Sequence, residues 1–128
     1  MNEPSGIQFT EPLPEGVADL RPWFITIHDL PDEIQWGEFW GNEQNVELDV
    51  GCGRGLFLFN ASLRNPETNY LGLELDFCEG RRTAKRLVKR EAPNARVVGG
   101  DATVVLKKHI PLGTVDAVHV YFPDPWWR

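Results

Sequence analysis

A glycine-rich turn at positions 49–55, with the sequence DVGCGRG, restricts the fold of this chain more than any other feature. An apolar run, VELDV at 46–50, leads into the turn, and a stretch of helical spacing follows it. Because Gly51, Gly53 and Gly55 have no Cβ, their backbone can turn sharply and approach a ligand closely. The segment therefore predicts a strand, a tight turn and a helix, with the turn either open to a ligand or serving only as a connection.

The same unit of strand, turn and helix recurs along the rest of the chain. Apolar runs alternate with stretches of helical spacing, which is typical of a parallel sheet joined by right-handed helical crossovers. The predicted fold class is therefore α/β, with a Rossmann-like parallel sheet. The expected strands are 46–50, 70–75, 95–98 and 115–122, and the expected helices are about 56–65, 77–92 and 102–108.

The first 45 residues differ in composition from the rest. Residues 1–22 hold four prolines and few large apolar side chains, which predicts a flexible arm because such a segment cannot offset the entropy of ordering. In the following aromatic-rich stretch, a short helix between Pro31 and Gly41 is expected to cover one side of the sheet, with base stacking by its aromatic residues as the alternative. The chain thus divides into an arm, 1–22, and one domain, 23–128, made of this cover and the first four strands.

Charge is distributed unevenly between the two halves. Residues 1–60 hold 2 basic and 11 acidic side chains, whereas residues 61–128 hold 11 basic and 8 acidic ones. An acidic first half argues against a phosphate-binding surface there, and the basic second half leaves nucleic acid open as a partner. The chain has no apolar run near the ~20 residues that span a bilayer and no signal peptide at its start, so we expect a cytoplasmic protein without membrane contact.

The cysteines and histidines do not predict a metal site. Cys52 and Cys78 lack the paired spacing of zinc ligands, and Cys52 fits a small residue in a tight turn. His28, His109 and His119 have no ligand spacing either. Because His119 alternates with valines on an expected strand, we interpret it as a packed residue rather than a catalyst.

The spacing of the glycine turn distinguishes between possible ligands. A dinucleotide fingerprint has the form G-x-G-x-x-G, whereas here the third glycine arrives one residue early and Asp49 precedes the first by two. A carboxylate in that place repels a pyrophosphate and attracts an ammonium group. This favours S-adenosylmethionine, which carries a sulfonium and an α-ammonium group and whose carboxylate suits the N-terminus of the following helix.

Two further acids follow the next two expected strands. Glu74 ends the second strand, 25 residues after Asp49, where a carboxylate can accept hydrogen bonds from both ribose hydroxyls. Asp101 follows the third strand and can accept from the adenine amino group, although it is also a credible N-cap for the next helix. Each acid alone can be a solvated loop residue, but ligands bind at the carboxyl edge of such sheets, so three successive acids there predict a binding site.

The last expected strand leads into the segment YFPDPWW at 121–127. Pro123 and Pro125 restrict the backbone on both sides of Asp124, so this carboxylate is expected on a stiff loop. One interpretation is a rigid turn with two tryptophans packed on the sheet edge. The other is that Asp124 and its neighbours hold a planar base beside the sulfonium.

Four segments, in this order and spacing, resemble the bacterial tRNA (guanine-N7)-methyltransferases of the class I Rossmann-like type: ELDVGCGRGLFL, NYLGLEL, GGDA and VYFPDPWWR. The match covers residues 46–128, and FPDPW is its most specific part. The resemblance implies transfer of a methyl group from S-adenosyl-L-methionine to N7 of a guanine in tRNA. It also implies a catalytic role for Asp124 and a cofactor site made of Asp49, Gly51, Gly53, Glu74, Asp101 and Asp124.

The resemblance covers only the N-terminal half of the family's sequence pattern. Its members continue beyond PDPW through a basic segment, further strands and a late threonine-containing substrate loop, whereas this sequence stops at Arg128. We therefore expect the methyltransferase fold to be C-terminally incomplete, as a fragment, an incomplete gene product or half of a dimer. The alternative functions are a non-catalytic S-adenosylmethionine-binding fragment and a methyltransferase with another substrate.

The expected helix 77–92 carries a dense basic segment, with six basic residues at positions 81–90. Its apolar stripe is expected at Phe77, Gly80, Ala84 and Leu87 or Val88. The charges occupy the remaining surface, which is either a solvated helix face or a contact for tRNA phosphates.

Overall fold

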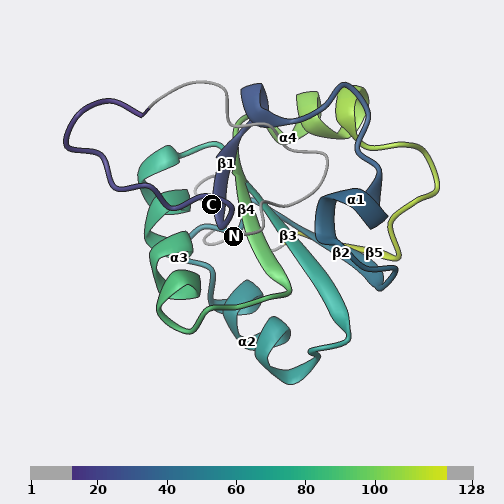
Figure 1. Cartoon of the computed structure of the whole chain (residues 1–128). Helices are drawn as coiled ribbons and strands as arrows, with labels where there is room; N and C mark the ends of the chain where they lie inside the picture. Colours follow the sequence, from purple (N-terminus) through teal and green to yellow (C-terminus); the bar gives the residue numbers. More distant parts are fainter. Residues whose placement is uncertain (1–12, 121–128) are drawn as a thin grey trace, which may run out of the picture.

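A computed structural model describes residues 13–120 of the 128-residue chain. Its centre is a sheet of five strands in the order β1-β4-β3-β2-β5, and every neighbouring pair is parallel (Figure 1). The strands are β1 (Phe24–Thr26), β2 (Asn45–Val50), β3 (Thr68–Glu74), β4 (Ala95–Gly99) and β5 (Ala117–Val120). The predicted α/β class and parallel sheet are confirmed.

Helices cover both faces of this sheet (Figure 1). One face packs against α2 (Leu56–Arg64) and α3 (Phe77–Lys89). The other packs against α1 (Trp36–Trp40) and the π-helical turn η2 (Val105–His109), which continues α4 (Ala102–Val104); a short 3-10 turn, η1 (Ile27–Asp29), follows β1. Within residues 13–120 no helix is long and apolar enough to cross a bilayer.

Between β2 and β5, the direction in which the chain adds strands to the sheet reverses once. From β2 the chain moves outward to β3 and then β4, and it next crosses back over β2 to reach β5. The crossovers before and after β4 therefore lie on opposite faces of the sheet. Doubly wound sheets bind ligands at such a reversal, outside the carboxyl ends of the strands, which here is the crevice between β2 and β5.

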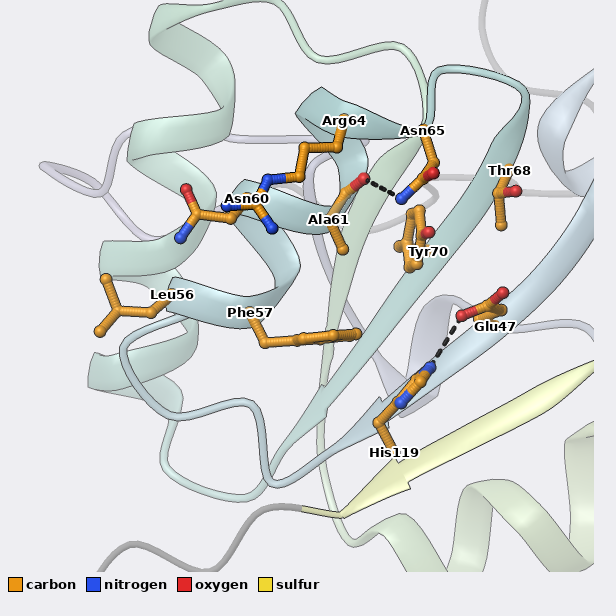
Figure 2. A pocket seen from close by; sticks show the side chains of 10 residues that line it. All are labelled: Glu47, Leu56, Phe57, Asn60, Ala61, Arg64, Asn65, Thr68, Tyr70 and His119. Carbon is orange, nitrogen blue, oxygen red and sulfur yellow. Dashed lines mark hydrogen bonds and ion pairs between the residues drawn. The ribbon is translucent and has the colours of Figure 1, made fainter.

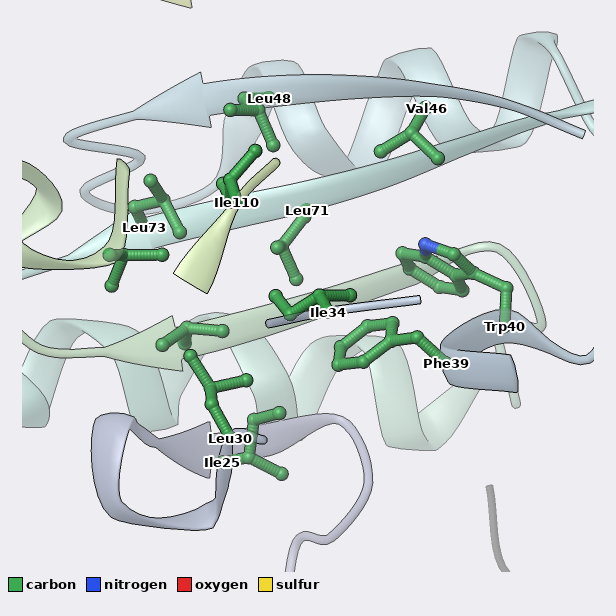
Figure 3. Close-up of a cluster of buried hydrophobic side chains, with 12 residues drawn as sticks. Ile25, Leu30, Ile34, Phe39, Trp40, Val46, Leu48, Leu71, Leu73 and Ile110 are labelled. Carbon is green, nitrogen blue, oxygen red and sulfur yellow. The ribbon is translucent and has the colours of Figure 1, made fainter. Parts of the chain in front are cut away.

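Two apolar layers join the sheet to its helices. The first contains Phe39 of α1 together with Leu48 and Leu71 of the central strands, and all three are at most 1% exposed (Figure 3). The second layer, on the other face, contains Leu58 of α2 and Leu87 of α3, both fully buried. Both layers draw on the same strands because successive side chains of a strand point to opposite faces.

The segment expected only to cover the sheet also contributes a strand. β1 pairs with β4 at the edge of the sheet, with Phe24 opposite Val97. The expectation of four strands was therefore incomplete. Three residues are too few to show an alternating pattern, and the pairing joins segments about 70 residues apart, so no local signal reveals it.

Two boundaries in the N-terminal part also differ from the expected ones. The helix expected from Pro31 is confined to Trp36–Trp40 and ends at Gly41, which adopts a φ of 77°. Leu20, within the expected arm, is 7% exposed and belongs to the second apolar layer. Packing thus begins before residue 23, and the division into an arm and a domain stays a prediction.

Candidate functional site

The glycine turn lies at the carboxyl end of β2, next to β5, where the winding of the sheet reverses. Gly51, Gly53 and Gly55 have φ values of 69°, 54° and 75°, in the left-handed region that favours glycine. A cavity of about 380 Å³ opens there, lined by Asp49, the turn and the start of α2. A Cβ on Gly51 would meet no atom of the described residues 13–120 within 4 Å, so among these residues this backbone faces open space. The turn is therefore accessible to a ligand.

Hydrogen bonds to the end of β3 fix one side of the turn. The N–H groups of Gly51 and Cys52 donate to the carbonyl of Leu73, at 2.7 and 3.2 Å. The N–H of Gly53 donates to Glu74 Oε1 at 2.6 Å. A turn constrained in this way keeps its shape before a ligand arrives, which lowers the entropic cost of binding.

Helix α3 constrains the turn from the other side. Thr83 Oγ1 donates to the carbonyl of Gly53 at 2.9 Å, and Arg86 Nη1 donates to the carbonyl of Arg54 at 3.2 Å. Thr83 also fills the space beside Gly55, where a Cβ would lie 2.7 Å from Thr83 Oγ1 and closer still to its Cγ2. Thr83 was not predicted as a site residue. Its only sequence signal is its position next to the apolar stripe of the helix, and that position does not indicate a contact with the glycine turn.

Asp49 is buried beside the turn, with 3% of its surface exposed. Burial raises the pKa of its carboxyl to about 6, while the neighbouring His119 acts to lower this pKa and Glu74 acts to raise it. At neutral pH the group is still ionised, so a negative charge is maintained in a poorly solvated place. Such a charge attracts a cationic group on a ligand, which compensates for the lost hydration.

Replacing Asp49 by asparagine is expected to stabilise the protein at neutral pH. The carboxyl titrates near its ordinary value of 3.8 in the unfolded chain and at about 6 in the folded one, so the free energy of unfolding falls as the pH rises through this window and stays lower above it. The shift corresponds to about 3 kcal/mol, and water in the open cavity screens part of it. We expect the variant to gain about 1 to 2 kcal/mol above pH 7 and almost nothing near pH 4. Urea unfolding across this pH range measures the difference, and a gain independent of pH would contradict the assignment.

Glu74 ends β3, the strand next to β2, and its carboxylate organises the surrounding backbone. Its Oε1 accepts from the N–H of Gly53 at 2.6 Å, and its Oε2 accepts from the N–H of Asp76 at 2.9 Å. Each carboxylate oxygen can accept a second hydrogen bond, so both remain acceptors for a ligand hydroxyl. Because the charge of Glu74 contributes to the raised pKa of Asp49, the two carboxylates act within one site.

Asp101 follows β4, the next strand of the sheet, and its side chain is exposed. Its Oδ1 accepts from the N–H of Thr103 at 2.8 Å, which confirms the predicted N-cap. The N–H of Gly100 donates to the carbonyl of Glu74 at 2.9 Å, so the ends of β3 and β4 are joined. Asp49, Glu74 and Asp101 thus lie at the carboxyl ends of three neighbouring strands.

Three exposed apolar side chains lie at the same edge, and the sequence analysis did not single them out as site residues. Leu75 follows β3 and is 71% exposed, Phe77 begins α3 and is 45% exposed, and Leu56 begins α2 and is 60% exposed. The expectation that Phe77 belongs to the buried stripe of its helix was wrong, because the first residue of α3 lies at the edge of the sheet rather than over it. Exposed apolar surface beside polar groups is suited to packing against a planar ring.

A second cavity, of about 510 Å³, lies beside α2, β2 and β5 (Figure 2). His119 Nε2 lies 2.7 Å from Glu47 Oε1 there, and the imidazole packs on the ring of Phe57 at a centroid distance of 4.5 Å. His119 also lies opposite Asp49 in the pairing of β2 with β5. His119 thus packs on a neighbouring ring at the wall of the cavity, and its interpretation as a packed residue rather than a catalyst stays a prediction.

Of two other residues singled out in the sequence, the structure describes Cys52 but not Asp124. Cys52 is buried in the turn, where burial and the charges of Asp49 and Glu74 raise the pKa of its thiol. The thiol therefore stays protonated, as expected of a small packing residue. Asp124 lies outside the described residues 13–120, and its role stays a prediction.

Comparison with known proteins links the chain to one family. A family model with the description "Putative methyltransferase" matches residues 43–128. Three relatives named tRNA (guanine-N(7)-)-methyltransferase also match. They come from Rhodopirellula baltica (44% identity over 90% of this chain and 44% of that protein), Geobacter metallireducens (34%, 82% and 50%) and Streptococcus equi subsp. equi (29%, 83% and 50%). The chain spans about half the length of the curated relatives it matches.

The matched residues, 43–128, include the glycine turn and the acids at the carboxyl ends of β2, β3 and β4. They also contain the whole of the stretch 46–128, which carries the sequence resemblance to the tRNA (guanine-N7)-methyltransferases. That resemblance is confirmed by the relatives that bear this name. The chain therefore belongs to the methyltransferase family that the model describes.

Proposed function

We propose that this chain forms the cofactor-binding part of a tRNA (guanine-N7)-methyltransferase, which transfers a methyl group from S-adenosyl-L-methionine to N7 of a guanine in tRNA. One observation carries the proposal. A glycine turn lies where the winding of the sheet reverses, and Asp49, Glu74 and Asp101 lie at or just after the carboxyl ends of three neighbouring strands around it. The relatives named for this activity, which match 82 to 90% of the chain, support the choice of substrate.

The residues at the crevice fit S-adenosyl-L-methionine. Within the part of the chain that the structure describes, a Cβ on Gly51 would meet no atom within 4 Å, and the cavity in front of it borders Asp49. Asp49 supplies a negative charge for the α-ammonium group, Glu74 supplies acceptors for the ribose hydroxyls and Asp101 supplies one for the adenine amino group. Arg54, which lines the same cavity, and the N-terminus of α2 supply donors for the carboxylate of the cofactor.

The demands of the reaction match a site that binds and aligns. When bound, S-adenosyl-L-methionine supplies an electrophilic methyl group on a positively charged sulfur. Guanine N7 carries a free lone pair, so no residue of this chain has to remove a proton before attack. The constrained turn and the exposed Leu75 and Phe77 therefore serve to orient the reactants, which is most of what such a transfer requires. To Asp124 we assign the task of holding the guanine and offsetting the positive charge that develops on its imidazole ring.

Replacing Glu74 by alanine is expected to weaken the binding of S-adenosyl-L-methionine or its demethylated product by about 1 to 3 kcal/mol, roughly 5- to 150-fold. The variant loses the acceptors for the ribose and also the bonds from the N–H groups of Gly53 and Asp76. Isothermal titration calorimetry measures the affinity. Glu67→Ala is the matched control, because Glu67 is exposed, carries the same charge and precedes the opposite end of β3. If Glu74→Ala bound as tightly as this control, Glu74 would be removed from the site.

Methyl transfer tests the proposed function directly. Radiolabelled S-adenosyl-L-methionine and unmodified tRNA are supplied to the chain alone and to the chain joined to the C-terminal half of the Rhodopirellula baltica relative. We expect the joined protein to form 7-methylguanine in tRNA, and a tRNA that lacks the target guanine to stay unlabelled. Labelling of other substrates only, or binding of NAD in place of the methyl donor, would overturn the proposal.

A second candidate function is a cofactor-binding module without transfer activity. The observation that favours it is that Asp49, Glu74 and the glycine turn form a site for the methyl donor within residues 13–120, whether or not a transfer follows. Such a module binds the methyl donor in calorimetry and labels no tRNA in the assay above. We expect this result for the chain alone, and robust turnover by it would show that Asp124 and the described residues suffice.

A further inference from the structure

The six basic residues at positions 81–90 divide into two groups in the structure. Arg81, Arg86 and Arg90 each donate to an oxygen of another segment, at 2.5 to 3.2 Å. Each guanidinium also lies over a phenylalanine ring, at 5.0 to 5.6 Å from its centroid. These three side chains therefore attach α3 to its neighbours.

The other three residues, Arg82, Lys85 and Lys89, form what we name the α3 basic row. All three are exposed. Their spacing of three and four residues aligns them on one side of the helix, over about 10 Å. Arg82 lies 3.6 Å from Glu79 with 73% of its side chain exposed, which makes a weak pair. Among the described residues, no carboxylate lies within 4 Å of the ammonium groups of Lys85 and Lys89.

A row of like charges is unfavourable in the free protein. Neighbouring like charges on a helix cost about 0.2 to 0.5 kcal/mol per pair. A helix face that only needs hydration usually interleaves acids with its bases, but Glu79 is the one acid among the 13 residues of α3. An anionic partner would relieve this repulsion, and three exposed cations in a row suit a chain of repeated negative charges.

The helix that carries the α3 basic row contacts the turn at the crevice. Arg86, which lies between Lys85 and Lys89 in the sequence, donates to the carbonyl of Arg54, and Arg54 lines the cavity at the glycine turn. Helices α3 and α2 lie side by side on the same face of the sheet, and α2 begins directly after the glycine turn (Figure 1). A nucleic acid strand that lay along the row would therefore lead to the methyl donor.

We propose that the α3 basic row binds phosphates of an RNA backbone and thereby orients the RNA relative to the crevice. The proposal rests on the proposed function, because tRNA is the RNA on which that crevice would act. Contacts of this kind are independent of base sequence and release counterions. Binding through the row therefore weakens steeply as the salt concentration rises.

Removing the charges of the row tests the proposal. Binding of unmodified tRNA to the full chain is measured by fluorescence anisotropy at several salt concentrations. The test variant is Arg82→Gln/Lys85→Gln/Lys89→Gln, and the matched control, Arg64→Gln/Lys107→Gln/Lys108→Gln, removes the same charge from exposed positions outside α3. We expect the test variant to bind about tenfold more weakly at low salt and to lose about 2 to 3 units from the slope of log K against log salt, and the control to keep the wild-type slope.

The outcomes separate this proposal from the proposed function. Equal losses in the test and control variants, or no binding of tRNA by the unaltered chain at low salt, would overturn the role of the row. The test variant should bind S-adenosyl-L-methionine as tightly as the unaltered chain does, which shows that its fold and crevice are intact. If the unaltered chain bound tRNA through the row but bound no methyl donor, the proposed function would be wrong, whereas the role of the row in binding RNA phosphates would be supported.

Discussion

Replacing Gly55 by alanine is expected to lower the free energy of unfolding by about 2 to 5 kcal/mol, a large fraction of the stability of a small domain. The added Cβ would lie 2.7 Å from Thr83 Oγ1 and closer still to its Cγ2. Overpacking of this kind costs about 1 to 3 kcal/mol, and a φ of 75° adds about 1 to 2 kcal/mol for a residue with a Cβ. Urea unfolding, with the slope compared between variants, measures the loss.

Two further variants isolate the role of Thr83. Gly41→Ala is the matched control, because Gly41 has a φ of 77° at the end of α1 and a Cβ there would meet none of the described atoms within 4 Å. It should lose only the cost of the backbone strain, about 1 to 2 kcal/mol. Adding Thr83→Ala to Gly55→Ala should restore part of the stability, because the two closest atoms are removed. Equal losses for Gly55→Ala and Gly41→Ala would show that Thr83 does not confine the turn.

Replacing Gly51 by alanine is expected to weaken cofactor binding by about 2 to 3 kcal/mol, roughly 30- to 150-fold. A Cβ at this position meets no atom of residues 13–120 within 4 Å, so the cost to folding is limited to about 1 to 2 kcal/mol for the φ of 69°. The same Cβ would project from the wall of the cavity in which we place the methyl donor. Calorimetry with S-adenosyl-L-methionine measures the affinity, and urea unfolding measures the stability.

The contrast between the two glycines separates binding from folding. Gly55→Ala should lower the stability most, whereas Gly51→Ala should leave a folded protein with poor affinity. Both residues adopt left-handed backbone in the same turn, so the strain is matched and only the surroundings of the Cβ differ. A folded Gly51→Ala variant with unchanged affinity would place the methyl donor elsewhere.

The regular elements around the site follow from local pattern. The expected strands 46–50, 70–75 and 95–98 agree with Asn45–Val50, Thr68–Glu74 and Ala95–Gly99 within two residues at each end. Apolar runs bounded by glycine, asparagine and proline are signals that neighbouring residues supply. The cap formed by Asp101 was predictable for the same reason, since it needs only an acid directly before a helix.

Elements that depend on a distant partner were missed or misplaced. β1 is a strand because it pairs with β4 at the edge of the sheet, and its three residues are too few to show an alternating apolar pattern of their own. The exposure of Phe77 likewise depends on where α3 begins relative to the sheet edge. An apolar residue at the start of a helix has the same sequence signal whether it is covered or not.

The sequence by itself determined that this protein is a parallel α/β fold with acids at the carboxyl edge of its sheet, because periodicity and order along the chain are sufficient for both. Only the tertiary structure decided that Thr83 confines Gly55 and that burial raises the pKa of Asp49. It also decided which basic residues of α3 attach the helix and which form the exposed row. These properties arise from contacts between segments 20 or more residues apart, and local sequence patterns do not specify which distant segments meet.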